Sequence, residues 1–552
     1  SARGSGVGPF LGAMIIAYCV VVVGTLLASN PIVKSPTCTA TGGAGGMCGV
    51  ADPNLKFFDG KFLLFATHDF SINNTGFRMD NWQVWSSSDL VAWTLESTVR
   101  PQDSLKWDTQ LTECWATDAA YSNGAYYFYV SAGGSEVGVM TATSPKGPWS
   151  DPLGAPLLSN ALGKSLGTTF RDPCVFQEPG TDDFYLIAGV FTYYITKLRK
   201  DLISLAEKPK LVKFIGPDVY GPCGGNKTDD KPFLHKHNVT YYLSWGCFYA
   251  TSSSVYGPFT MQGAVIETKK IATEFQCDGQ PHQCGAAAAA KRQLPANGKS
   301  KMMMTATQRA RSEALAQYKS APAPAPWYLA EDLSDRHGSF LEHSKQWYYL
   351  SNDRSHSGDV GHEDVFRDTV GCYIHFRANN TMESCVINAQ GVNQHSLTEK
   401  RVIEAEEFFS LRGDDAKKVD LEEALQIRGE GFAVGGGHDT TIVYPHVTGF
   451  TDTAARAFTL RIATSGVGAL IEIRLNATSS LPHDVGDDDV LLLASCALPA
   501  TGGLTVFADV PCAFESSTLS TEDALKWEAE VTMRVVAVAA GARMRLDRFW
   551  QA

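Results

Sequence analysis

Hydrophobic and polar residues alternate in short segments along most of the chain, with the period of two that is typical of half-buried β-strands. Five segments share one order of features: a polar turn that in most contains Asp, a short apolar strand, a second turn, and an aromatic-rich strand. They read ADPNLKFFDGKFLLFATHD, CWATDAAYSNGAYYFYVSAG, FRDPCVFQEPGTDDFYLIAG, DKPFLHKHNVTYYLSWG and HGSFLEHSKQWYYLSND, and begin near residues 51, 114, 170, 230 and 337. Five similar β-units of this size predict the blades of a β-propeller over 48–400, with an array of β-sandwiches as the alternative.

The pattern changes near residue 401. Alternating segments such as AFTLRIATSG and ALIEIRLNAT predict a second all-β domain, a sandwich, over 401–552. Between the fourth and fifth units, residues 285–326 hold an alanine run, a methionine run, APAPAP and seven basic residues against Glu313. This insertion is either a solvated surface segment or a docking site for a protein partner or anionic lipid.

Near the N-terminus, a run of 20 uncharged residues extends from Phe10 to Ser29. Its length fits a membrane-spanning helix of about 20 residues, whereas the apolar core of a secretory signal has about 7–15. A cleaved signal and a buried core helix remain alternatives. We therefore expect a short tail over 1–9, a transmembrane helix or signal anchor over 10–29 and a Gly-rich linker over 30–47. The expected fold class is all-β, a five-bladed propeller followed by a sandwich, with an N-terminal transmembrane helix.

The cysteines bear on the compartment. Of 13 cysteines, one lies in the apolar run, and the other twelve either form disulfides or are scattered thiols. Neighbouring candidates for pairing are Cys38 and Cys48, Cys277 and Cys284, Cys372 and Cys385, and Cys496 and Cys512. Glycosylation sequons occur at Asn73, Asn226, Asn238, Asn379 and Asn476. Both features favour a single-pass membrane protein with a lumenal or extracellular body, and an organelle membrane stays open.

Composition narrows the function classes. Hydrophobic residues make up 44% and charged residues 19%, which excludes a disordered or coiled-coil protein. The net charge of −12 argues against general nucleic-acid binding. No P-loop, zinc cluster, GxSxG or nucleophilic Cys–His pattern occurs, and the GGG at 435–437 lacks the context of a dinucleotide-binding turn.

Two of the repeated units open on Asp-Pro, at Asp52 and Asp172. One Asp-Pro alone is most simply a turn. However, ADPNLKFFDGKF, SSSDLVAWT, CWATDAAYSNGAYYFYVS, RDPCVF and KPFLHKHNVTYYLSWG, taken in order, resemble glycoside hydrolase family 43 over about residues 48–390. That family comprises arabinofuranosidases, xylosidases and arabinanases on a five-bladed propeller. The C-terminal part resembles a carbohydrate-binding module of family 6 type, through IEAE, LRIATSGVGALIEIRL and LDRFW.

The resemblance implies inverting hydrolysis by carboxyl groups on either side of the scissile bond. It assigns the general base to Asp52, and the orientation of the acid and tuning of its pKa to Asp172. Where the family usually has Glu-Gly-Pro-Phe, this chain has Asp230-Lys231-Pro232-Phe233, so Asp230 takes the position of the general acid. Its side chain is one methylene shorter, which reduces its reach by about 1.5 Å. A different carboxylate as the acid, or no effective acid, are the alternatives.

The resemblance also suggests substrate and ion contacts. Candidates for binding sugar are Asp118, Trp115, Arg171, Trp245 and Arg336. Alternatively, Asp118 is a turn residue, the two tryptophans belong to the core, and the two arginines form structural ion pairs. His337 matches a histidine near the propeller axis, where some members hold calcium or another ion, and a structural histidine is equally open. No cofactor is required by the expected chemistry.

Together these features predict a membrane-anchored glycoside hydrolase that acts on arabinose- or xylose-containing glycans. The alternative is a catalytically inactive propeller that binds glycan or serves as a structural subunit of a membrane complex. The expected partners are a glycan substrate and, through residues 10–29, the membrane. Residues 285–326 are a candidate docking site for a protein partner, and nucleic acid is not an expected partner.

Overall fold

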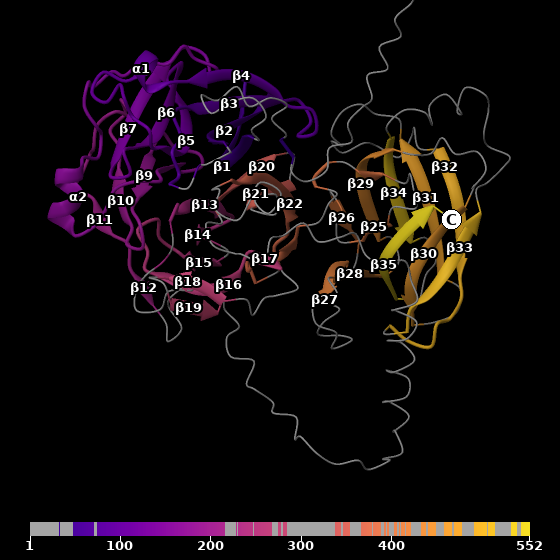
Figure 1. Ribbon diagram of the computed structural model, residues 1–552. Helices are drawn as coiled ribbons and strands as arrows, with labels where there is room; N and C mark the ends of the chain where they lie inside the picture. The colour runs from indigo at the N-terminus through magenta and orange to yellow at the C-terminus, as the bar shows by residue number, and fades with distance from the viewer. Residues whose placement is uncertain are drawn as a thin grey trace, which may run out of the picture.

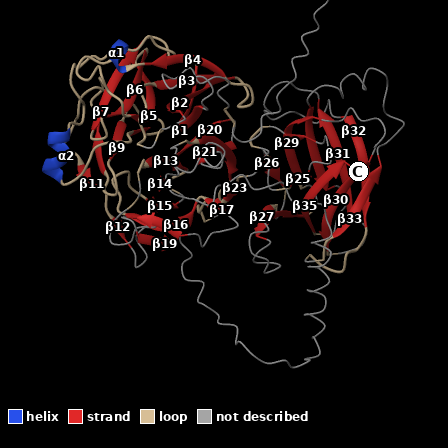
Figure 2. Ribbon diagram, in the orientation of Figure 1, coloured by secondary structure: helices blue, strands red, loops and turns tan. Residues whose placement is uncertain are grey.

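The computed structural model of the 552-residue chain is built almost entirely from β-strands, in two bodies that lie side by side (Figures 1 and 2). The structure describes residues 32–33, 48–70, 74, 76–215, 228, 230–246, 248–267, 274–277, 280–283, 337–343, 346–353, 366–377, 379–387, 391–393, 395–396, 402–405, 408, 410–413, 416–420, 432–437, 440–448, 457–465, 469–476, 491–504, 506–513, 531–537 and 543–551. The predicted insertion at 285–326 and the apolar run at 10–29 lie outside these residues. None of the helices in the described ranges has the length and apolar character needed to cross a membrane.

The first body contains five small sheets. Blade 1 has β1 (Cys48–Phe58), β2 (Lys61–Phe70), β3 (Trp82–Ser87) and β4 (Thr94–Val99). Blade 2 has β5 (Cys114–Ser122), β6 (Ala125–Ala132) and β7 (Glu136–Ala142). Blade 3 has β8 (Cys174–Gln177), β9 (Phe184–Ala188), β10 (Tyr194–Lys197) and β11 (Lys210–Leu211). Two short helices, α1 (Pro101–Ser104) and α2 (Asn160–Leu166), lie in the connections.

Blade 4 has β13 (Phe233–His237), β14 (Thr240–Trp245), β15 (Phe248–Ser252) and β16 (Phe259–Ala264), with β12 (Phe214–Ile215) at its outer edge. Blade 5 has β20 (Gly338–His343), β21 (Gln346–Asp353) and β22 (Asp368–Ile374). A hairpin of β18 (Glu274–Cys277) and β19 (Gln280–Gln283) and a parallel pair of β17 (Ile266–Glu267) and β23 (Cys385–Val386) complete this body.

The first strands of the five sheets form a closed ring. In chain order β1, β5, β8, β13 and β20 each contact the next, and β20 returns to β1. This closure is that of a five-bladed propeller and confirms the prediction made from the five repeated units. In blades 1 and 2, the turn between the first two strands is of the kind that its residues favour. Asp59-Gly60 and Asn123-Gly124 have positive φ at both central positions, as two-residue hairpin turns of this type require.

The second body is a sandwich of two sheets. One contains β24 (His395–Ser396), β26 (Ser410–Arg412), β29 (Thr441–Thr448), β31 (Ala469–Asn476), β32 (Leu491–Leu498) and β34 (Val531–Ala537). The other contains β25 (Val402–Glu404), β27 (Lys417–Asp420), β28 (Phe432–Gly436), β30 (Ala457–Thr464), β33 (Ala508–Ala513) and β35 (Met544–Gln551). Because β24 pairs with β29, this domain begins a few residues before the predicted boundary at 401.

Apolar side chains form a core within the sandwich and several clusters within and between the blades. Two of the neighbouring cysteine pairs are disulfides, Cys372–Cys385 in the propeller and Cys496–Cys512 in the sandwich. Cys114 and Cys174 are buried thiols, so the idea that all twelve cysteines outside the apolar run pair is wrong.

Candidate active site

Three turns of one kind bring polar side chains to the centre of the propeller. Asp52, Asp172 and Lys231 each directly precede a proline in the innermost strand of blades 1, 3 and 4 or just before it, and Asp52 lies at a bulge within β1. All three have a positive φ, of 51°, 55° and 42°. This left-handed conformation costs an L-residue about 1–2 kcal/mol, and such strain is concentrated at functional sites.

Asp52 is 1% exposed and is held on all sides. Its Oδ1 accepts hydrogen bonds from His337 Nδ1 at 2.6 Å and from Asn352 Nδ2 at 2.9 Å. Its Oδ2 accepts one from the Thr67 hydroxyl at 2.6 Å. Arg367 Nη1 adds an ion pair to Oδ1 at 3.0 Å. Residues from blades 1 and 5 thus fix the predicted general base.

These contacts set the charge of Asp52. Burial alone would raise the pKa of its carboxyl, but the charges of Arg367 and His337, the His337 hydrogen bond and the charge of Lys231 together outweigh burial. The pKa of Asp52 therefore lies well below its usual value. The carboxylate is an anion at neutral pH, which is the form that a base requires.

Arg367 is itself locked in place. Its guanidinium makes a two-bond contact with Asp69, from Nε to Oδ2 at 2.8 Å and from Nη2 to Oδ1 at 3.0 Å. The Phe77 ring lies 5.2 Å from the guanidinium carbon. Such a paired fork has little freedom, so Arg367 presents its charge to Asp52 in one orientation.

The carboxylate of Asp172 faces a second polar cluster. Its Oδ1 accepts a hydrogen bond from the Ser131 hydroxyl at 3.1 Å, and its own N–H donates to Ser131 Oγ at 2.6 Å. Arg171 Nη2 contacts Asp230 Oδ2 at 2.7 Å, and Arg171 Nε lies 3.7 Å from Asp172 Oδ2. Arg171 thus joins the two predicted carboxyls of blades 3 and 4, and its guanidinium lies 5.1 Å from the Trp115 ring.

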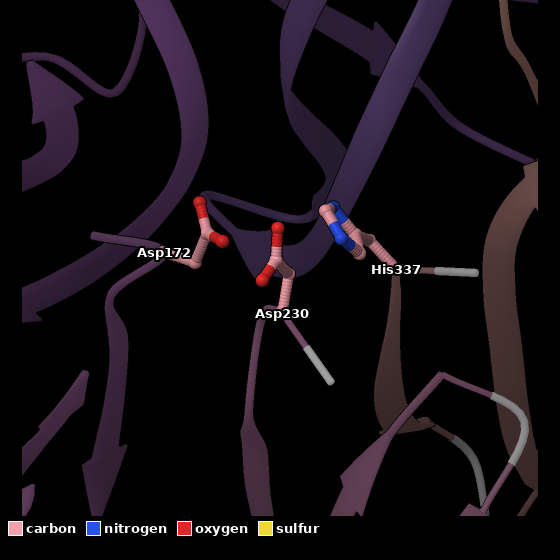
Figure 3. Close-up of side chains that lie close together, drawn as sticks. All are labelled: Asp172, Asp230 and His337. Atoms are coloured by element: carbon pink, nitrogen blue, oxygen red, sulfur yellow. The ribbon is translucent and has the colours of Figure 1, made fainter. Parts of the chain in front are cut away.

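Figure 3 shows that the side chains of Asp172, Asp230 and His337 point toward one another. One ligand-type atom from each lies within 4.8 Å of the others. His337 also bonds Asp52, so its imidazole contacts the predicted base and belongs to the cluster that holds the predicted acid. Glycoside hydrolysis needs a carboxyl group on each side of the scissile bond, and Asp52 and Asp230 are the candidates for these two groups.

A calcium ion does not fit these residues well. Ca²⁺ takes about six to eight oxygen ligands. The described cluster offers two carboxylates and an imidazole nitrogen, and Arg171 already contacts both carboxylates.

The other predicted sugar contacts have different surroundings. Asp118 is fully buried and bonds Lys56 Nζ at 2.7 Å and the Val175 N–H at 2.7 Å, so it ties blades 1, 2 and 3 together. Trp115 is half-buried and donates from its indole to the Phe77 carbonyl at 2.7 Å. Trp245 is 1% exposed and packs in the core with Tyr193 and Phe214, away from a sugar-binding surface. Arg336 lies outside the described residues.

Sequence reasoning missed four of the described residues that bond Asp52, namely Thr67, Lys231, Asn352 and Arg367. Arg367 and Asn352 come from blade 5, about 300 positions away in the chain, and no local motif marks them. The sequence marks Lys231 only as the residue after Asp230. The structure instead directs its ammonium to the backbone of Asp52 and Pro53.

Comparisons with known proteins show similarity to glycoside hydrolases over part of the chain. Residues 50–256 match the family model of glycosyl hydrolases family 43. An arabinoxylan arabinofuranohydrolase of Bacillus subtilis is 30% identical over 39% of this chain and 50% of its own length. One of Paenibacillus polymyxa is 30% identical over 42% of each chain. A xylosidase/arabinosidase of Bacteroides ovatus is 24% identical over 39% of this chain and 78% of its own.

The chain spans half or less of the first two relatives it matches. Among solved structures, a family 43 arabinoxylan arabinofuranohydrolase from Bacillus subtilis is similar over 91% of this chain and 96% of its own, at 19% identity and a TM-score of 0.45. The matched region holds Asp52, Asp172 and Asp230, together with the turns that position them. Residues 50–256, which contain blades 1 to 3 and the inner strands of blade 4, thus match glycoside hydrolase family 43.

Proposed function

We propose that this protein is a glycoside hydrolase that acts on arabinose- or xylose-containing glycans with inversion. Asp52 acts as the general base on a water molecule, Asp230 protonates the leaving oxygen, and Asp172 orients Asp230 through Arg171. The observation that carries the proposal is that His337 bonds Asp52 and lies with Asp172 and Asp230 in one cluster, where Asp52 and Asp172 both stand on strained Asp-Pro turns. The names of the relatives support the pentose substrates.

Asp230 is the weakest part of this machinery. A general acid must enter the reaction protonated, and a guanidinium at 2.7 Å stabilises the opposite, ionised form. The missing methylene also shortens its reach by about 1.5 Å. This observation favours a second candidate function, in which the propeller binds glycan without hydrolysing it.

The test measures turnover of aryl arabinofuranosides, aryl xylosides and arabinoxylan oligosaccharides by the full chain and three variants. Aryl leaving groups need little acid assistance. Asp52→Asn should abolish turnover of all substrates. Asp230→Asn should lose the oligosaccharides and keep the aryl glycosides, while Asp230→Glu should increase oligosaccharide turnover by about 10-fold or more. Proton NMR of the first product anomer tests inversion.

A folded wild-type protein that turns over none of these substrates would contradict the hydrolase. Binding of the same oligosaccharides in calorimetry, lost in a variant of the site such as Arg171→Met, would then support the glycan-binding candidate. The two functions are thus separated by one set of proteins.

We also infer that residues 10–29 anchor the protein in a membrane, with the body on the lumenal or extracellular side. The uncharged run of 20 residues and the two disulfides support this location. Release of the full-length protein from membranes by alkaline carbonate would contradict it. The sandwich as a glycan-binding module and residues 285–326 as a protein-docking segment remain predictions.

A further inference from the structure

Lys231 occupies in blade 4 the place that Asp52 and Asp172 hold in blades 1 and 3. It directly precedes a proline at the start of the innermost strand, and its φ of 42° lies in the left-handed region that favours glycine. A lysine in this conformation is strained, so its side chain must make contacts that offset the strain.

Those contacts reach two other blades. Lys231 Nζ donates to the carbonyl oxygen of Asp52 at 2.7 Å and to that of Pro53 at 3.2 Å. The Lys231 N–H donates to Asp172 Oδ2 at 3.3 Å. One residue of blade 4 therefore bonds both Asp-Pro turns, one through its side chain and one through its backbone.

The ammonium is buried in an acidic surrounding. Lys231 is 1% exposed, and the negative charges of Asp52, Asp118 and Asp172 act on its ammonium. Burial lowers the pKa of Lys231, while these three carboxylates act in the opposite direction. Carbonyl oxygens beside carboxylates are the surroundings that a hard cation takes in proteins, and here an ammonium takes them.

We propose that Lys231 is a positioning residue, a built-in cation that holds the Asp52-Pro53 turn and the Asp172 carboxylate in register across the propeller axis. It sets where the general base stands and makes a bound metal ion at the axis unnecessary. The catalytic part of this inference rests on the proposed function, whereas the structural part does not.

Two variants separate the charge from the rest of the side chain. Lys231→Met keeps the apolar stem and removes the cation, and Lys231→Gly removes both while relieving the left-handed backbone. We expect kcat on aryl glycosides to fall by about 10- to 100-fold in both, with KM changed by less than about threefold, because a displaced base loses geometry and not binding. Unchanged kcat in Lys231→Met would overturn the positioning role.

Lys236→Met is the matched control. Lys236 lies on strand β13, which follows Lys231, and its ammonium bonds Glu178 and Tyr241 and neither of the Asp-Pro turns. Its loss should lower the melting temperature and leave kcat within about twofold. An equal fall of kcat in Lys236→Met would show a general effect of losing a cation from this strand and would overturn the proposal.

A readout without catalysis tests the cation itself. Methylammonium chloride should raise the melting temperature of Lys231→Gly above that in sodium chloride at equal ionic strength, and leave wild type and Lys236→Met unaffected. Calcium and EDTA should not shift the melting temperature of wild type. No methylammonium effect on Lys231→Gly, or stabilisation of wild type by calcium, would overturn the built-in cation. These results hold even if every protein is inactive, so they are independent of the proposed function.

Discussion

At the scale of single residues, the charge of Arg367 makes the largest single contribution that keeps Asp52 ionised. Burial opposes ionisation of this carboxyl, and the guanidinium at 3.0 Å is the largest influence that favours it. Since the pKa of Asp52 is lowered on folding, ionised Asp52 adds stability fully above its unfolded pKa of about 3.9. That stability is lost as the pH falls through the folded pKa.

Replacement of Arg367 by Met should therefore raise the pKa of Asp52 and move the acid limb of kcat/KM to higher pH. We expect kcat to fall by about 100-fold as well, because Asp52 loses an orienting bond. Activity against pH on aryl glycosides measures both effects. Arg367→Lys keeps a positive charge but loses the two-bond contact with Asp69. The acid limb should therefore lie closer to its wild-type position than in Arg367→Met, while kcat should stay nearly as low as in Arg367→Met. An acid limb that stays in place in Arg367→Met would contradict this account.

The identity of Asp52 and Asp172 was predictable from their Asp-Pro turns, but the network around Asp52 was not. Arg367 and Asn352 reach Asp52 only because blade 5 closes the ring against blade 1. These contacts between blades 5 and 1 join positions from 285 to 315 apart and leave no spacing signal in the chain. Trp245 shows the converse: an aromatic in a strand can face the core or the surface, and the sequence pattern alone does not distinguish them.

At the scale of elements, close approach of strands depends on particular glycines. A Cβ added to Gly49 in β1 would lie 1.9 Å from the Arg367 carbonyl oxygen. A backbone atom cannot move aside as a flexible side chain can, so blade 5 must shift. The repeated units predicted the strands and their order. The contact between Gly49 and the Arg367 backbone was not predictable from them, because it forms only when blade 5 closes the ring against blade 1.

Gly49→Ala should accordingly destabilise the protein by about 1–3 kcal/mol and lower kcat, since the displaced backbone carries Arg367. Thermal unfolding and aryl glycoside turnover measure the two effects. Gly76→Ala is the control, because a Cβ at Gly76 meets nothing within 4 Å, and it should stay within about 0.5 kcal/mol of wild type. Full activity and stability in Gly49→Ala would show that blades 1 and 5 are less tightly coupled than the contact implies.

At the scale of the whole molecule, described side chains of the propeller and the sandwich contact each other. The His375 ring, next to β22, stacks on Phe408 of the sandwich at a centroid distance of 4.1 Å. Nearby, Lys418 Nζ of β27 lies 3.9 Å from Glu383 Oε2 of the propeller. The two domains were predictable from the change of pattern near residue 401, but nothing in that pattern indicates that a histidine lies between them.

This histidine makes the contact sensitive to acid. Burial, with the charge of Lys418, holds the pKa of His375 well below its usual value, so the ring is neutral in the folded protein. A lowered histidine pKa adds stability that is complete above the unfolded value of about 6.5 and is lost as the pH falls toward the folded value. The contact between the domains should weaken in that direction.

Calorimetry of the full chain should therefore show one unfolding transition near pH 7.5 and a broadened or split transition near pH 5. His375→Phe keeps an aromatic ring against Phe408 and cannot take a proton, so its transitions should remain coupled at both pH values. His235, also buried in the propeller with its pKa lowered to about 3, is the control. Its stacking partners Phe340 and Tyr242 lie within the propeller, so His235→Phe should leave the splitting unchanged. A His375→Phe protein that splits like wild type would assign the acid sensitivity to another group, and coupling between the two domains would then rest on contacts other than this stacked pair.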